Sequence, residues 1–430
     1  MKDALFLSFY FPPYAGIEVM RAVKWCKYLP DAGWRPIVLS TTAKGTMDRR
    51  MEADLAEVEI VRTARPVLHS PAVTGEYQPN RGWPDWLKKF LQSTVMFPDR
   101  YWQWARQGAA MIPELKRKYP HVRAVVATGY PWSAYVLAEQ IAEAYGVPIV
   151  LDLRDAWTLN PARIWNSGRH RRLEQRLFQK AGGVIVATRS MQEEYAALYP
   201  DLAEKLHVIH NGYDPVDRVI VQHMLEDKLH VLHAGFEPSG RKLRVVYTGT
   251  FNGHEVPPAD HRQSPYYFLL AVQKLRKRMP ELASRLDVVF AGKTASRKLV
   301  SELGLEDIVT FLGHRSYEET LQLQGSADLL LLFVGPVNRH VLTGKVFEYM
   351  ATGKPILAMI PTGTELHGLL HDYGGAVVTE TKDVDAIAAR LGEFVEGTVR
   401  LGEVNEPFLE SLSRGKQAKM LAAMLEEASR

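Results

Sequence analysis

Short, nearly continuous apolar runs alternate with segments of helical pattern along the whole chain. In the first half these runs are residues 5–9, 35–40, 59–62, 124–128, 148–152, 183–187 and 207–210; in the second they are 243–247, 286–290, 309–312, 329–333, 356–358 and 376–378. A strand that is apolar on both sides has to be buried on both faces, which favours a parallel sheet covered by helices. The sequence therefore predicts an α/β protein with two doubly wound, Rossmann-like domains facing a cleft, where such sheets bind ligands.

The length of the chain, 430 residues, also favours two domains. Residues 213–241 are polar and weakly patterned, so they are predicted to link an N-terminal domain, 1–212, to a C-terminal domain, 242–405. Residues 406–430 are predicted to form a C-terminal helix. The apolar residues expected to make its buried stripe are Leu409, Leu412, Met420, Leu421, Met424 and Leu425.

Composition excludes several classes of protein. A net charge of +4 is too small to imply nucleic acid as a partner, and the single cysteine, Cys26, excludes an intramolecular disulfide or a cysteine-based zinc cluster. The first apolar run is short and ends before Pro12-Pro13, so it is expected to be a strand and not a signal peptide. With no apolar run of about 18 residues, a cytoplasmic protein is expected.

Some motifs are misleading. Gly292-Lys293-Thr294 resembles the end of a phosphate-binding P-loop, but the glycine that this loop needs is replaced by Asp287. The histidines lack the spacing of metal ligands, and no Gly-x-Ser-x-Gly elbow is present. These observations argue against an NTPase, a zinc site and an α/β-hydrolase.

The segment 341–358 carries the clearest chemical signal. Thr343-Gly344-Lys345 forms a polar turn before a helix that is expected to stop at Thr352-Gly353, ahead of a strand. The N–H groups and dipole at a helix start favour phosphate, and Lys345 adds a cation. Glu348, one turn further, is placed to accept hydrogen bonds from ribose or sugar hydroxyls. These features suit a sugar diphosphate; the alternative is an ordinary helix start with a surface Lys and Glu.

The chain resembles the retaining family 4 glycosyltransferases, which have the two-domain B-type fold, over nearly its full length. The segments that carry the resemblance are 8–17, 33–39, 208–214 (Val-Ile-His-Asn-Gly-Tyr-Asp), 246–250, 289–292, 309–313, 327–333 and 347–358. Each match is weak by itself, but their order and spacing are typical of the family. The resemblance implies that the last helix braces the N-terminal domain.

The chain departs from the family at two places. The family has two glutamates eight positions apart; Glu348 fits the second, which binds the nucleotide ribose, but the first falls on His340. That first glutamate lies near the transferred sugar, so its replacement puts this contact in doubt. The Arg/Lys pair that follows the first C-domain strand is also missing after Gly249, and Lys345 is expected to supply the charge.

The resemblance implies a donor site and a catalytic pair. The donor-binding residues are expected to be Gly16, Gly249, Lys293, Thr343, Gly344, Lys345 and Glu348. Asp155 is the candidate near the reacting sugar and Arg154 contacts the diphosphate or the acceptor; the alternative is a structural Asp–Arg pair. The helix start and basic side chains neutralise a departing diphosphate without a metal, so neither metal nor cofactor is expected.

Basic and aromatic segments of the N-terminal domain give the prediction for the acceptor. Residues 83–91 and 101–106 combine tryptophans with cations, and Arg169, Arg171, Arg172, Arg176 and Lys180 follow. Such surfaces lie on anionic lipid, where a polyprenyl-linked acceptor resides, and favour peripheral binding to the inner face of the plasma membrane. The alternative is that the tryptophans pack in the core and the charges are solvated.

The sequence thus predicts a retaining, metal-independent hexosyltransferase-like enzyme that moves a sugar from a nucleotide-diphosphate donor to a lipid-linked or polysaccharide acceptor in cell-surface glycan assembly. Two alternatives stay open: a catalytically silent glycan-binding or scaffold protein, which the replacement by His340 allows, and a nucleotide-sugar 2-epimerase. The sequence does not identify the donor sugar, its base or the acceptor.

Overall fold

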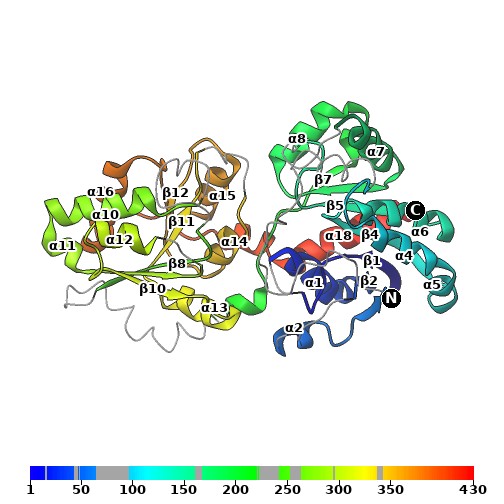
Figure 1. Ribbon diagram of the computed structural model, residues 1–430, viewed down its shortest axis with the longest axis horizontal. Helices are drawn as coiled ribbons and strands as arrows, with labels where there is room; N and C mark the ends of the chain where they lie inside the picture. The colour runs from blue at the N-terminus through cyan, green and yellow to red at the C-terminus, as the bar shows by residue number, and fades with distance from the viewer. Residues whose placement is uncertain are drawn as a thin grey trace, which may run out of the picture. The chain divides into compact units, whose positions relative to one another are not determined.

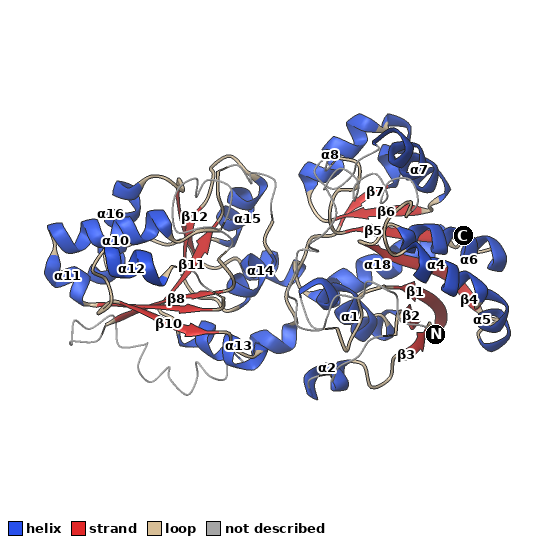
Figure 2. Cartoon of the chain, in the orientation of Figure 1, coloured by secondary structure: helices blue, strands red, loops and turns tan. Residues whose placement is uncertain are grey.

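The computed structural model describes residues 1–14, 17–42, 47, 49–63, 96–159, 167–219, 221, 242–251, 263–293, 296–336 and 342–430. The chain divides into two compact units. The first comprises Met1–Asn211 and Arg414–Arg430, and the second Gly212–Ser413. Each is an α/β sandwich with helices on both faces of a parallel sheet (Figures 1 and 2), so the predicted fold class of two doubly wound, Rossmann-like domains is confirmed.

The first unit is built on a seven-stranded sheet of order β3-β2-β1-β4-β5-β6-β7, in which every pairing is parallel. Its strands are β1 (Lys2–Leu7), β2 (Trp34–Ser40), β3 (Glu59–Arg62), β4 (Val122–Gly129), β5 (Ile149–Leu153), β6 (Gly183–Val186) and β7 (Leu206–Val208). Its helices are α1 (Ile17–Tyr28), η1 (Pro30–Ala32), α2 (Arg49–Asp54), α4 (Trp102–Ala110), α5 (Ile112–Lys118), α6 (Ser133–Tyr145), α7 (Ser167–Lys180), α8 (Arg189–Leu198), η2 (Pro200–Lys205) and α18 (Arg414–Ala428).

Alternate residues of the central strands enter separate cores on the two faces of this sheet. Leu5 and Leu7 of β1 pack with helices α4 and α6, whereas Ala4 and Phe6 pack with α1 and α18. The chain leaves β1 toward β3 and returns at β4 to build the other side. The strand order therefore reverses between β1 and β4, the place where doubly wound sheets bind ligands.

The second unit repeats this plan with a six-stranded parallel sheet of order β10-β9-β8-β11-β12-β13. Its strands are β8 (Leu243–Thr248), β9 (Leu286–Ala291), β10 (Val309–Gly313), β11 (Leu329–Phe333), β12 (Ile356–Met359) and β13 (Ala376–Thr379). Its helices are α10 (Tyr266–Arg278), α11 (Pro280–Ser284), α12 (Arg297–Glu302), α13 (Tyr317–Ser326), α14 (Gly344–Ala351), α15 (Glu365–Tyr373), α16 (Val384–Glu396) and α17 (Glu406–Ser411). Here the strand order reverses between β8 and β11.

The C-terminal tail is two helices instead of the single helix predicted over 406–430. Leu409 of α17 and Leu412 are buried in a core of the second unit, whereas Leu421 and Leu425 of α18 are buried against the first sheet and α1 (Figure 1). The apolar residues expected to form one stripe thus serve two cores, which breaks the helix at Leu412. Met420 is 45% exposed and lies outside both cores.

The segment expected to open the linker is also partly packed. Tyr213 is buried in the same core of the second unit as Leu409, and its backbone bridges to Ser413. The polar residues that follow Tyr213 hide this burial in the sequence pattern.

Candidate functional site

The turn before α14 has the geometry of an anion-binding helix start. Thr343 is the N-cap residue, with extended backbone (φ −71°, ψ 137°), and its side chain makes no capping hydrogen bond. The carbonyl of Thr343 accepts from the N–H of Val346 at 3.2 Å, which closes the first turn. Because the cap side chain does not satisfy the N–H groups of this turn, they and the helix dipole favour an anion near Gly344.

Lys345 lies beside the turn that follows β8. Its Nζ donates to Oε1 of Gln263 at 3.1 Å and lies 5.1 Å from the centre of the Tyr247 ring. Burial lowers the pKa of this lysine to about 8, against the opposing effect of Glu348. A desolvated ammonium whose neighbours are an amide and a ring is well suited to receive a phosphate.

Gly249 makes room for this lysine. With φ of +141°, Gly249 has a backbone conformation that other residues rarely adopt, and a Cβ there would lie 2.1 Å from Cε and 2.5 Å from Nζ of Lys345. A Cβ on Gly292 would lie 2.1 Å from the carbonyl oxygen of Gly249, so the turns after β8 and β9 also touch. The structure thus brings together Gly249, Gly344 and Lys345, at the point where the strand order reverses.

Lys293 follows Gly292 in this cluster of turns. Its carbonyl accepts from the N–H of Phe251 at 3.1 Å, while the residue itself is exposed. The backbone of Lys293 therefore fixes the turn after β8, and its cation is available to solvent.

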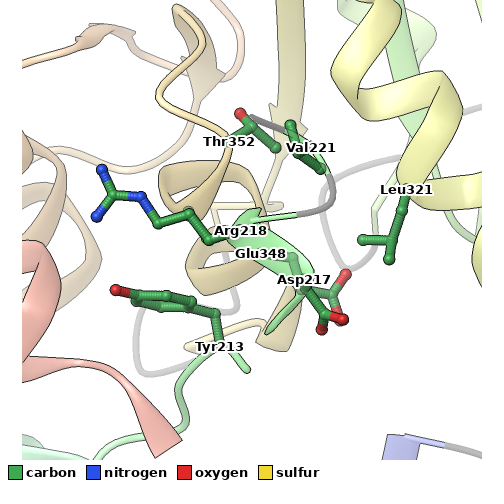
Figure 3. A pocket seen from close by; sticks show the side chains of 8 residues that line it. Tyr213, Asp217, Arg218, Val221, Leu321, Glu348 and Thr352 are labelled. Atoms are coloured by element: carbon green, nitrogen blue, oxygen red, sulfur yellow. The ribbon is translucent and has the colours of Figure 1, made fainter. Parts of the chain in front are cut away.

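Glu348 lines a small pocket of the second unit (Figure 3). Its other lining residues are Tyr213, Asp217, Arg218, Val221, Leu321, Ala351 and Thr352. Asp217 accepts a hydrogen bond from the Tyr317 hydroxyl at 2.6 Å, and Arg218 binds Glu406 at 2.6 Å. In Figure 3, Tyr213 and Arg218 extend to one side of the pocket and Asp217 reaches toward Leu321 on the other. The carboxylate of Asp217 therefore lines the same pocket as Glu348. The sequence pattern did not predict this neighbour.

In the first unit, Arg154 and Asp155 directly follow β5. Nε of Arg154 donates to the carbonyl of Gly129 at 2.9 Å, and Nη2 to that of Tyr130 at 3.4 Å, so this side chain supports the loop after β4. Asp155 is exposed. The two residues lie at the carboxyl end of the sheet, as the sequence predicts for a site, and their roles stay predictions.

A buried ion pair lies behind them. The guanidinium of Arg21 lies 2.9 Å from the carboxylate of Asp152, and both side chains are almost fully buried. Arg21 also donates to the carbonyls of Ile209 and His210, and Thr128 donates to Asp152 at 2.8 Å. Burial lowers the pKa of Arg21, and Asp152 opposes this effect. The pair ties α1, β5 and the end of β7 together.

Several predicted features lie outside the described residues: Gly16, His340 and the basic–aromatic segment 83–91. In the second such segment, Tyr101 and Trp104 are fully buried, so core packing, the alternative left open by the sequence, holds for these two rings. Arg176 and Lys180 pair with Glu139 of α6, which removes two cations from the expected basic surface of α7. Arg169, Arg171 and Arg172 are exposed.

Two further findings concern membranes and metals. Within the described ranges, no helix has the length and apolar character needed to cross a membrane. The same residues contain no group of three or more His, Cys, Asp or Glu arranged to hold a metal ion.

The fold of this chain is shared with solved proteins of one architecture. The structure is similar over almost its whole length to solved glycosyltransferases of B-type fold. For a glycosyltransferase from Rickettsia africae ESF-5, the TM-score is 0.64 and the identity 13%, over 99% of this chain and 98% of the other. For WaaG, a glycosyltransferase involved in lipopolysaccharide biosynthesis, the TM-score is 0.52 and the identity 14%, over 99% of this chain and 98% of the other. For a UDP-GlcNAc 2-epimerase from Neisseria meningitidis, the TM-score is 0.52 and the identity 15%, over 99% of both chains. At these identities the similarity concerns the fold alone.

The sequence identifies the family. The model of Glycosyltransferase Family 4 matches residues 19–217, and that of Glycosyl transferases group 1 matches residues 244–396. The chain belongs to the family 4 glycosyltransferases, so the resemblance predicted from the sequence is confirmed. No curated protein matches the sequence.

Proposed function

We propose that this glycosyltransferase is a retaining enzyme that uses a nucleoside diphosphate sugar. The observation that carries the proposal is the cradle formed by Gly249, the start of α14 and Lys345, whose ammonium is desolvated and has no carboxylate in direct contact among the described residues. A diphosphate adds negative charge next to this desolvated cation. Thr343 and Gly344 provide backbone N–H groups, and Glu348 accepts hydrogen bonds from the ribose. Lys293 and Gly16 complete the donor contacts in this proposal.

The reaction follows from these roles. The bond between the anomeric carbon and the diphosphate oxygen breaks, and the electron pair stays on the diphosphate. The acceptor hydroxyl oxygen bonds to the same face of that carbon, and its proton passes to the departing diphosphate. Lys345 and the helix dipole stabilise the charge that develops on the leaving group, without a metal ion. Asp155 stabilises the positive charge on the sugar, and Arg154 holds the loop after β4.

The proposed acceptor is a glycan that is lipid-linked or part of a surface polysaccharide. The solved relative WaaG is named for lipopolysaccharide biosynthesis, which agrees with this class of acceptor. Exposed Arg169, Arg171 and Arg172 offer about 1 kcal/mol each at an anionic membrane surface. We therefore place the enzyme in the cytoplasm, in reversible contact with the inner face of the plasma membrane.

A donor screen followed by product analysis tests the proposal. Thermal unfolding is measured with UDP-, GDP- and dTDP-sugars, since a ligand that binds only the folded chain raises its melting temperature. The stabilising donor is then incubated with and without glycan acceptors, and the products are separated. A glycoside with the donor's anomeric configuration supports the proposal. An epimerised nucleotide sugar, or binding without any turnover, would contradict it and identify an epimerase or a silent binding protein.

A further inference from the structure

Three tyrosines and an arginine meet at the carboxyl ends of β1 and β4 in the first unit. Tyr10 follows β1, Tyr130 follows β4, and Arg100 and Tyr101 precede α4. The rings of Tyr10 and Tyr130 lie 6.0 and 5.6 Å, respectively, from the ring of Tyr101. This is where the strand order of the first sheet reverses, the usual ligand position of such sheets. Sequence reasoning missed the group because its members lie far apart along the chain.

A chain of hydrogen bonds runs through this group. Nη2 of Arg100 donates to the Tyr101 hydroxyl at 2.6 Å, and the hydroxyls of Tyr101 and Tyr10 are 2.7 Å apart. A guanidinium only donates, so the Tyr101 oxygen is an acceptor. Tyr101 is fully buried, and either hydroxyl of the Tyr10–Tyr101 pair can be the donor.

The surroundings of the Arg100 charge are a second feature of this group. In the described part of the chain no carboxylate forms an ion pair with it, and its Nε is buried without a hydrogen-bond partner. The neighbouring carboxylate, Asp99, is used elsewhere: it accepts from the N–H of Tyr101 at 2.8 Å and from the N–H and hydroxyl of Ser133 at 2.8 and 2.9 Å. Partial burial of a cation among neutral phenols costs desolvation free energy, and a bound anion offsets this cost.

The tyrosines add neutral donors around the cation. Burial raises the pKa of the Tyr10 and Tyr130 hydroxyls, so both stay protonated at physiological pH. Both residues are partly exposed, as is Arg100. A ligand thus meets one guanidinium and two phenolic O–H groups, a set that donates hydrogen bonds to an oxyanion and to nearby sugar oxygens.

We propose that Arg100, Tyr10 and Tyr130 form a subsite for an oxyanion carried by the acceptor, so that the acceptor is a glycan bearing a phosphate or a carboxylate. This inference rests on the proposed function, because it names the substrate class of the acceptor. Among the described residues no carboxylate pairs with Arg100, so an anionic glycan supplies a counter-charge there that a neutral glycan does not.

Calorimetry on the full chain tests the subsite while saturating nucleoside diphosphate occupies the donor site. Glucose 1-phosphate, glucuronate, inorganic phosphate and neutral glucose are the probes. The anionic sugars are expected to bind more tightly than glucose. Arg100→Gln should lower the affinity for the anionic sugars by about tenfold or more. Tyr10→Phe, which keeps the ring, should produce a smaller loss. Arg117→Gln is the matched control, since it removes an exposed cation from α5, away from this group in the sequence, and should change nothing.

The outcomes separate this subsite from the proposed function. Tight binding of glucose 1-phosphate alone identifies a phosphorylated acceptor, and binding of glucuronate as well identifies recognition of oxyanions in general. If the anionic sugars bind no better than inorganic phosphate, the group does not recognise a glycan and the inference is overturned. Equal binding of glucose, or an Arg100→Gln protein that binds like the wild type, also overturns it. In each of these cases, retained nucleotide binding leaves the proposed function standing; loss of nucleotide binding by the wild type contradicts that function instead.

Discussion

Lys345 is expected to couple donor binding to proton uptake. Its pKa is lowered from 10.5 to about 8, which corresponds to an unfavourable free energy of about 3 kcal/mol for the charged form in the unliganded protein. A diphosphate next to the ammonium returns a favourable interaction only if the lysine is charged. Binding therefore raises the pKa of Lys345 again, and above pH 8 the complex must take up a proton.

The expected magnitude follows from the pKa. At pH 7 about nine-tenths of the lysine is already protonated, so donor binding takes up about 0.1 proton; at pH 9 it takes up about 0.9 proton. Over the same interval the affinity for the nucleoside diphosphate should fall about tenfold. The terminal phosphate, with a pKa near 6, is about nine-tenths ionised at pH 7 and almost fully ionised at pH 9, so its own titration changes the affinity little.

Calorimetric titrations in buffers of different ionisation enthalpy measure this proton uptake directly. Lys345→Arg is the matched control, because arginine stays charged throughout the range and should bind with no proton uptake and no loss of affinity at pH 9. Lys345→Met should bind weakly at every pH. Proton uptake near zero in the wild type at pH 9, or equal uptake in Lys345→Arg, would refute the assignment.

The same lowered pKa affects the stability of the unliganded fold. Between pH 8 and about 10.5 the unfolded chain binds more protons at this lysine than the folded chain does, so the contribution of Lys345 to stability rises with pH in that window.

Three other outcomes are expected. Glu348→Gln should weaken nucleotide binding by about 1–3 kcal/mol in calorimetry, the loss for a charge-assisted hydrogen bond; unchanged affinity would contradict a ribose contact. Transfer activity should survive a chelator, because Lys345 and the start of α14 neutralise the leaving group; activity that manganese or magnesium specifically restores would show that a metal is needed. Leu421→Ala in α18, at a fully buried position, should cost about 2–5 kcal/mol of unfolding free energy, whereas Met420→Ala, at an exposed one, should cost little. Equal melting temperatures for these two variants would show that α18 adds no stability.

Local signals in the sequence determined the elements of the fold. A strand that is buried on both faces has to be apolar at successive positions, so the run Leu329–Phe333 predicts β11 with its observed bounds. The turn at Thr343 and Gly344 likewise predicts the start of α14, and Gly353, with φ of +69°, the end of it. These features depend on neighbouring residues only, which is why a single sequence is enough to find them.

Only the tertiary structure decided which residues meet. Lys345 reaches Gln263, 82 positions away, and Tyr10 reaches Tyr101, 91 positions away. These contacts depend on the order of the strands, which places the ends of β8 and β11, and of β1 and β4, side by side. The break in the tail at Leu412 has the same origin, because Leu409 packs in a core of the second unit and Leu421 in a core of the first. Local pattern specifies that a residue is buried, but its partners are set by the strand order, because that order brings distant parts of the chain into contact.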